Sequence, residues 1–353
     1  MDVYLVCYIT LFILAMKETL ISKYSLRQTY LLCGLFIIAF SLIAGIRYGI
    51  GKDYYSYQAI FHFVRNFSDY NYLEPGFRFI ISFVKLMGIS EKFLFFIFAF
   101  ISLFFLFIGI RKNSHSPVLS AFIFLLVFYI GYTFNAMRQG VVMSIFIFIL
   151  DDIEKRKLKK VTFFTILGMT MHYSAVFILV GYFFNKIKIT RKKYILMTIL
   201  LFGIILTSNL WADIITGLAP GVVKAKLNLY SENFELGVDF ISIMQRLLLL
   251  TPFLIYYPKL SENNEKFQGI FKLYFLGFVL YSIFSFQDTF ATRVNMLFRI
   301  LEIILLPYLL SININKFEKT MILFLIVCWA TLTYLIELNY PFNYPFKTVF
   351  GVY

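Results

Sequence analysis

Cysteine, histidine and charged residues are scarce in this chain of 353 residues. Charged residues make up 15% of it, and cysteine and histidine occur three times each. The three cysteines lie far apart in apolar stretches, which excludes a disulfide framework and a cysteine-based metal site. No metal and no cofactor is expected. These six residues are Cys7, Cys33, Cys328, His62, His115 and His172.

Two motifs of soluble enzymes are also missing. The glycines at 45 and 51 have five residues between them, and Lys52 is followed by aspartate. A phosphate-binding P-loop needs four intervening residues and a serine or threonine after the lysine, so it is excluded. Ser174 follows His172 closely but has no G-x-S-x-G around it, which excludes a nucleophile elbow.

Long apolar runs fill most of the sequence. It is 60% hydrophobic, with a mean hydropathy of +0.80. The runs do not alternate, so we expect an all-α polytopic membrane protein of about 10–12 transmembrane helices, forming a single integral membrane domain over 1–353. Residues 1–16 lack a basic start and a cleavage motif and are expected to be a retained span. The expected spans are 3–16, 29–46, 93–110, 117–132, 137–150, 194–210, 241–257, 269–286, 294–311 and 320–336.

Two segments do not fit a simple span. Residues 76–89 are short and half polar, which indicates a re-entrant or interfacial helix. Residues 161–184 lie between basic clusters at 155–160 and 186–193. If both clusters are cytoplasmic, the segment is a helical hairpin with His172 near its tip. A single span is the alternative.

The basic residues predict the orientation. The net charge is +14, and it concentrates in short loops between the spans. The positive-inside rule places these loops in the cytoplasm, so membrane topology explains the charge and nucleic-acid binding is not expected. The outward segments then include loops of about 47–75 and 211–240, the tip at His172 and the tail from 337 onward.

The first outward segment, residues 47–57, combines glycines, tyrosines and charge. Arg47 can hold a phosphate through two hydrogen bonds, and Asp53 can accept a proton from a sugar hydroxyl. Tyr54 and Tyr57 suit the faces of sugar rings. The alternative is an aromatic belt at the membrane surface with a snorkelling arginine.

Two further polar groups lie at expected outward ends. Arg138 and Gln139 open a span, where an anionic lipid headgroup is a natural partner for the arginine. A plain headgroup anchor is the alternative. His172 is either a general base or a hydrogen-bonded structural residue.

Arginines recur near the end of the chain. Arg293, Arg299 and Glu302 are expected on one helix, and Arg246 lies inside another span. Arginine in lipid is costly and suggests function, although Arg299 and Glu302 are spaced to form a structural ion pair. The proline-containing tail 339–347 cannot continue a helix. It either folds back over the outer mouth or is disordered.

Several of these groups resemble the EpsG family in order and spacing, over nearly the whole chain. Lys52 and Lys347 depart from its usual residues. The Arg293 region followed by Pro307 is similar to a later family signature. The matching motifs are Arg47-Tyr48-Gly49-x-Gly51-x-Asp53-Tyr54-x-x-Tyr57, Glu74-Pro75-Gly76-Phe77, Met137-Arg138-Gln139-Gly140, His172-x-Ser174-Ala175 and Tyr344-Pro345-Phe346-Lys347.

The resemblance implies a Wzy-like polymerase of lipid-linked repeat units, acting at the outer side of the bacterial inner membrane. The expected partners are an oligosaccharide on undecaprenyl pyrophosphate, membrane lipids, a flippase and a chain-length regulator. Arg47 and Arg138, then Arg293, are expected to bind pyrophosphate, and Asp53 or His172 to be the base. Tyr54, Tyr57, Gln139 and Arg299 are further expected substrate contacts. A flippase and an O-antigen ligase are the alternatives, and a structural scaffold gives no reason for the outward charges.

Overall fold

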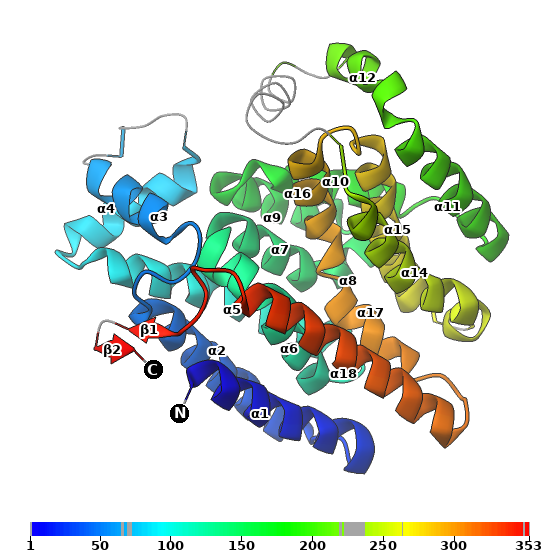
Figure 1. The fold of residues 1–353 in the computed structure, drawn as a ribbon, viewed down its shortest axis with the longest axis horizontal. Coiled ribbons are helices and arrows are strands. Elements are labelled where there is room, and N and C mark those ends of the chain that lie inside the picture. The colour runs from blue at the N-terminus through cyan, green and yellow to red at the C-terminus, as the bar shows by residue number, and fades with distance from the viewer. Residues whose placement is uncertain are drawn as a thin grey trace. The chain divides into compact units, whose positions relative to one another are not determined.

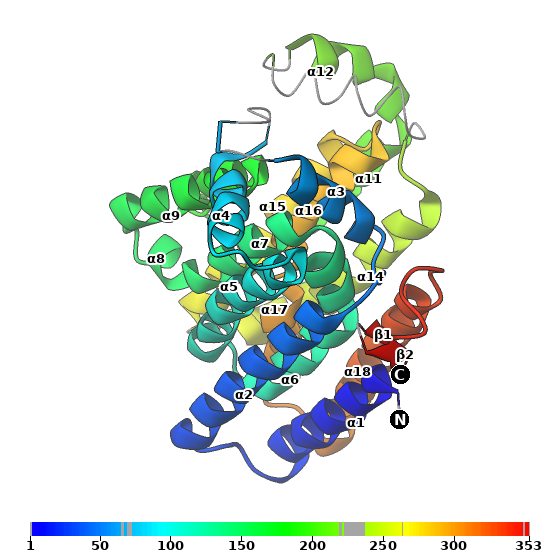
Figure 2. The ribbon, with the colours of Figure 1, turned by 90° about the vertical axis from the view of Figure 1, so that its left-hand side faces the viewer.

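The structure is a computed structural model that describes residues 2–64, 67–68, 73–218, 221, 237–262, 264–348 and 350–352. Nearly all of this part of the chain is helical (Figures 1 and 2). The chain forms two compact units. Unit 1 comprises Met1–Leu179 and Ile303–Tyr353, and unit 2 comprises Val180–Glu302.

Unit 1 contains both ends of the chain. Its helices begin with α1 and close with α18, and a two-stranded antiparallel sheet, β1 with β2, follows α18. The elements are α1 Val3–Met16, η1 Lys17–Ile21, α2 Leu26–Ile46, α3 Tyr54–Phe63, α4 Pro75–Leu86, α5 Glu91–Asn113, α6 Pro117–Phe124, η2 Leu125–Asn135, α7 Met137–Phe148, α8 Leu150–Glu154, α9 Leu158–Met171, η3 Tyr173–Ala175, most of α17 Glu302–Leu309, α18 Lys316–Leu338, β1 Lys347–Thr348 and β2 Gly351–Val352.

Unit 2 begins within α10 and ends at the first residue of α17. Most of the expected outward loop 211–240 lies outside the described residues, which resume at 237. The elements are α10 Val176–Phe184, shared with unit 1, α11 Arg191–Leu206, η4 Ser208–Leu210, α12 Ala212–Leu218, α14 Phe240–Ser261, α15 Glu265–Ile283 and α16 Asp288–Arg299.

The core of unit 1 is built on α5, which packs against α2 and α7. Gly109 of α5 makes this packing close: a Cβ there would lie 2.7 Å from the backbone carbon of Ile147. The hydroxyls of Ser102 and Ser144 hydrogen-bond each other at 2.8 Å in the same interface. The two helices therefore meet through small residues whose buried polar groups are paired.

Six helical stretches of the described chain are long and apolar enough to cross a membrane. Two shorter apolar helices, Met137–Phe148 and Tyr173–Phe184, accompany them. The all-α polytopic membrane class predicted from the sequence is confirmed. The six are Val3–Ile21, Leu26–Ile46, Glu91–Asn113, Pro117–Asn135, Phe240–Ser261 and Lys316–Leu338.

The expected span 294–311 is not one continuous helix, because α16 ends at Arg299 and α17 begins at Glu302. The chain passes from unit 2 to unit 1 at this break. Within α17, Pro307 has no N–H to donate to the carbonyl of Ile303. The hydroxyl of Ser120 donates to that carbonyl instead, at 2.5 Å.

The two irregular segments are short helices. Residues 75–86 form α4, with Pro75 at its first position, where the missing N–H costs nothing. The segment 161–184 is interrupted at His172, which has extended backbone angles and ends α9. The interruption was predicted from the sequence, whereas the return of the chain to the same side stays a prediction.

Residues 339–348, named here the C-terminal strap, fold back onto the rest of unit 1. In both views α18 runs beside α1, and the chain then turns toward the end of α2 (Figures 1 and 2). The hydroxyls of Tyr8 and Thr331 join α1 to α18 at 3.1 Å. The backbone N–H of Tyr48 donates to the carbonyl of Lys347 at 2.9 Å. Of the two expectations for the tail, folding back is the one that the structure shows.

Candidate active site

An ion pair between Glu74 and Arg138 lies at the centre of the candidate site. Glu74 immediately precedes α4, and Arg138 is the second residue of α7. The carboxylate is almost fully buried, whereas the side chain of Arg138 is 24% exposed. Protein groups therefore hold one part of the Arg138 side chain while another part stays accessible.

Aromatic rings surround this ion pair. The Arg138 guanidinium lies over the ring of Phe77, 5.0 Å from its centroid. Tyr57 of α3 meets Phe77 edge to face, with centroids 5.9 Å apart. Burial raises the pKa of the Tyr57 hydroxyl, and the positive charge of Arg138 partly offsets that shift. Tyr57 is thus a neutral hydrogen-bonding group near a fixed cation.

Gly76 brings the end of α9 to the same place. A Cβ at Gly76 would lie 2.5 Å from the Thr170 hydroxyl and 2.8 Å from the Thr170 carbonyl oxygen. Only glycine allows α4 to begin this close to α9. Thr170 is two residues before His172, so the start of α4 links Arg138 to the segment that carries the histidine.

The hydrogen bonds of His172 fix its tautomer. Its Nδ1 accepts the backbone N–H of Ser174 at 3.2 Å, and the Ser174 hydroxyl lies 2.8 Å away. Because a backbone N–H can only donate, Nδ1 is unprotonated and the neutral ring carries its proton on Nε2. In this state His172 offers a donor at Nε2 rather than a base.

Asp53 lies at the start of α3, where its backbone carbonyl accepts the N–H of Tyr57 at 3.0 Å. The side chain is half-buried and caps no amide of the helix. Its carboxylate therefore makes no capping hydrogen bond to α3. This is compatible with a role as a proton acceptor in a reaction.

Arg47 follows the last residue of α2 and is fully buried. Its guanidinium carbon lies 4.6 Å from the ring centroid of Phe95 and 4.5 Å from that of Phe134. Burial lowers the pKa of Arg47 to about 10, so the group is still cationic at neutral pH. Its Nη2 contacts the sulfur of Met137 at 3.7 Å, next to Arg138 in the sequence.

The alternative interpretation of residues 47–57, a tyrosine belt with a snorkelling arginine, is contradicted for three of the residues. Arg47 and Tyr54 have no exposed surface, and Tyr57 is 5% exposed. Tyr54 stacks on Phe95 at 4.9 Å instead of facing a membrane surface. The physical reason is that packing with α5 and cover by the C-terminal strap enclose the segment.

Gln139 and Gly140 belong to the interior of unit 1. Gln139 is 3% exposed. A Cβ at Gly140 would lie 2.0 Å from the carbonyl oxygen of Tyr132, so the glycine allows η2 and α7 to touch. Within residues 137–140, Arg138 is the residue with exposed surface. Gln139 and Gly140 are packed in the interior of unit 1.

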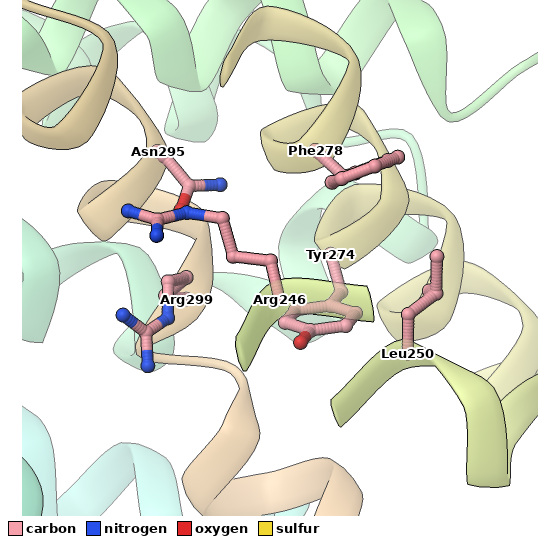
Figure 3. Close-up of a pocket in the computed structure, with 6 residues that line it drawn as sticks. All are labelled: Arg246, Leu250, Tyr274, Phe278, Asn295 and Arg299. Atoms are coloured by element: carbon pink, nitrogen blue, oxygen red, sulfur yellow. The ribbon is translucent and has the colours of Figure 1, made fainter. Parts of the chain in front are cut away.

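Unit 2 holds a separate arginine pair. Arg246 extends from α14 toward Asn295 of α16, with Arg299 beside it (Figure 3). Arg246 Nε donates to Asn295 at 3.1 Å, and Arg299 Nε donates to Glu302 at 2.8 Å. The cavity that these residues line has a volume of about 10 Å³, which holds about one water molecule.

The predicted Arg299–Glu302 pair is therefore confirmed, and it belongs to a closed network. Tyr274 also donates to Glu302, at 3.2 Å. Arg293 lies on α16 and is exposed. Substrate contacts by Arg293 and Arg299 stay predictions. Among the described residues, no group of three or more acidic, histidine or cysteine side chains is placed to hold a metal ion.

Sequence reasoning missed the role of Glu74 as the buried partner of Arg138. It also missed Thr170, which packing with α4 places beside the site.

The fold and the site together define a multi-pass α-helical membrane protein with an arginine-based polar site lined by aromatic rings. A family model matches residues 30–348, and the chain belongs to the EpsG family. Members of this family are Wzy-like polymerases, which makes the chain a polysaccharide polymerase-like membrane protein. No curated protein and no solved structure matches the chain.

Proposed function

We propose that this protein polymerises lipid-linked oligosaccharide repeat units into a bacterial surface polysaccharide such as O-antigen. The growing chain on undecaprenyl pyrophosphate is the donor, and one lipid-linked repeat is the acceptor. The observation that carries the proposal is the Glu74–Arg138 pair at the meeting point of α3, α4, α7 and the end of α9. Three segments that resemble the family contribute to that point.

The reaction is a glycosyl transfer. A hydroxyl oxygen at the non-reducing end of the acceptor forms a bond to the anomeric carbon of the donor. The bond between that carbon and the pyrophosphate oxygen breaks, and undecaprenyl pyrophosphate leaves with the electron pair. The hydroxyl proton passes to a base of the protein.

The leaving pyrophosphate gains negative charge as the bond breaks, and fixed cations stabilise that charge. Arg138 suits this role, because Glu74 and Phe77 hold its side chain while part of that side chain is exposed. Arg47 is the second cation proposed for the pyrophosphate. Arg293, which the sequence also suggested for pyrophosphate, is exposed on α16 of unit 2, and its contact with substrate stays a prediction.

Asp53 is the proposed base, because its carboxylate caps no backbone amide and lies one helical turn from Tyr57. His172 is proposed to act through its Nε2–H, which can donate to a phosphate or sugar oxygen. This differs from the sequence expectation of a histidine base, and it follows from the hydrogen bond that Nδ1 accepts.

The proposed location is the bacterial inner membrane, with the site on the periplasmic side. A lipid-linked donor is activated by its own pyrophosphate, which is the leaving group. No nucleotide is therefore needed on the periplasmic side. The distribution of basic loops supports this orientation.

A strain that lacks the gene, complemented with the wild type or with Arg138→Ala, tests the proposal. In a host that makes O-antigen, gels of the lipopolysaccharide are expected to show a ladder with the wild type. With Arg138→Ala we expect the core capped by a single repeat. Loss of every repeat in the deletion strain would instead favour a flippase or a ligase, and an unchanged ladder would exclude O-antigen polymerisation.

A further inference from the structure

Arg47 is fully buried, and its neighbours Tyr54, Phe95, Phe134 and Asn135 form what is named here the Arg47 chamber. The Nε and Nη1 of Arg47 and Oδ1 of Asn135 are buried and have no hydrogen-bond partner among the described residues. Gly51 lies between two of these groups: a Cβ there would be 2.6 Å from Asn135 Oδ1 and 3.3 Å from Arg47 Nη1. Burying such groups unpaired is costly unless another state or a ligand satisfies them.

The C-terminal strap covers this chamber at two points. The N–H of Tyr48 donates to Lys347 O at 2.9 Å, and the N–H of Gly51 donates to Phe342 O at 2.8 Å. Between these points Phe346 is fully buried, and its ring lies 6.5 Å from that of Phe134, which itself lines the Arg47 guanidinium. The strap thus contacts the segments on both sides of Arg47.

Few contacts hold the strap in place. Its ring Phe346 packs on Tyr4 at 5.2 Å, and the carbonyl of Asn343 accepts the Tyr4 hydroxyl at 2.8 Å. The side chains of Tyr340, Phe342 and Tyr344 point outward, each more than half exposed. A segment that lies almost entirely outside helices, held by one buried ring, the buried side chain of Asn343 and a few backbone contacts, opens more readily than the helices below it.

We propose that the C-terminal strap is a movable cover, and that it must lift from residues 48–51 before a pyrophosphate group can reach Arg47. The structure is then the closed state. The inference rests on the proposed function, because it assigns Arg47 a ligand that the closed chamber does not admit. Opening would expose both unpaired guanidinium nitrogens, which match the geometry of phosphate oxygens.

A reversible lock tests the proposal. Arg47 faces Thr348 in an antiparallel bridge, so Tyr48 and Lys347 lie directly opposite each other. Such a hydrogen-bonded pair has Cα atoms about 5.5 Å apart, within the range of a disulfide. Tyr48→Cys with Lys347→Cys, in a chain whose three native cysteines are replaced by alanine, is therefore expected to crosslink on oxidation.

We expect the oxidised protein, purified and supplied with lipid-linked repeats, to form polymer at least about tenfold more slowly than the same sample after reduction. Each single-cysteine variant is the matched control and should not respond to the redox change. Equal rates for the fully crosslinked and the reduced protein would overturn the inference. The proposed function would still stand in that case if Arg138→Ala abolishes polymerisation.

Amide hydrogen exchange gives a second test that needs no activity. The N–H groups of Tyr48 and Gly51 donate to the strap, so they exchange when it lifts. Phe346→Ala should speed their exchange by about tenfold or more, whereas Phe350→Ala should leave it unchanged, because Phe350 is 78% exposed. If both amides in the wild type are as protected as those in the middle of α2, the strap is a fixed part of the fold and the proposal is wrong.

Discussion

Glu74 and Arg138 are 64 residues apart in the sequence, and their side chains form an ion pair at the start of two helices. The pair joins α4, a helix of 12 residues, to α7 in the interior of unit 1. It positions the partly exposed side chain of Arg138 among rings from α3 and α4.

Glu74→Gln should lower both stability and polymerisation. The substitution leaves the cation of Arg138 without its buried partner, and removing one member of a buried pair costs about 3–5 kcal/mol. Because Arg138 is partly exposed, we expect a smaller loss, about 1–3 kcal/mol. Thermal unfolding in detergent measures it. The double variant Glu74→Gln with Arg138→Gln is the control. Its loss of stability should be smaller than the sum of the losses in the two single variants.

Gly76→Ala should disturb the contact between α4 and α9. The added Cβ would meet the Thr170 carbonyl at 2.8 Å, and a backbone group cannot rotate away. Overpacking of this kind costs about 1–3 kcal/mol. Gly34→Ala in α2 is the matched control, because nothing lies within 4 Å of its added Cβ. Unfolding temperatures that fall equally for both variants would contradict the account.

His172→Asn and His172→Gln separate the two roles of the histidine. Asparagine can keep an acceptor near Nδ1 for the Ser174 N–H, but it has no group at the position of Nε2. We therefore expect near-normal stability with polymerisation reduced about tenfold or more, a range that general acid–base and donor groups commonly contribute. Glutamine can place an amide donor near the position of Nε2 but keeps no acceptor near Nδ1. Its variant should therefore lose stability while polymerisation stays near normal. If the asparagine variant polymerises at the wild-type rate, His172 has only a structural role as a helix cap.

Ser120→Ala should destabilise unit 1, because the Ile303 carbonyl loses the donor that replaces the missing N–H of Pro307. A buried acceptor left unpaired costs about 1–3 kcal/mol. In a Pro307→Ala background residue 307 supplies its own N–H, so the same substitution should cost less. A double-mutant cycle on thermal unfolding measures the difference, and full additivity would show that the two groups are independent.

The sequence was sufficient for features that depend on local pattern. Long apolar runs predicted the all-α membrane class, and the spacing of Arg299 and Glu302 predicted their ion pair. A half-polar stretch predicted the short helix α4. Hydropathy and helical periodicity determine such features within one segment.

Features that depend on which segments meet were not predictable. Periodicity gives the apolar face of a helix but not its neighbour, so the pairing of Glu74 with Arg138 was missed. Arg47 was expected near the surface, yet packing with Phe95 and Phe134 encloses it. The prolines of the strap excluded a helix without indicating that Phe346 would be buried beside Tyr4.

Reconstituted polymerisation tests the central claim most directly. The purified protein is placed in liposomes with lipid-linked repeat units from its own host, and the products are separated by size. The account predicts that wild-type protein joins repeats and releases undecaprenyl pyrophosphate, and that Arg138→Ala at equal folded amounts does neither. Polymer of normal length and yield from Arg138→Ala would contradict the assignment of this site.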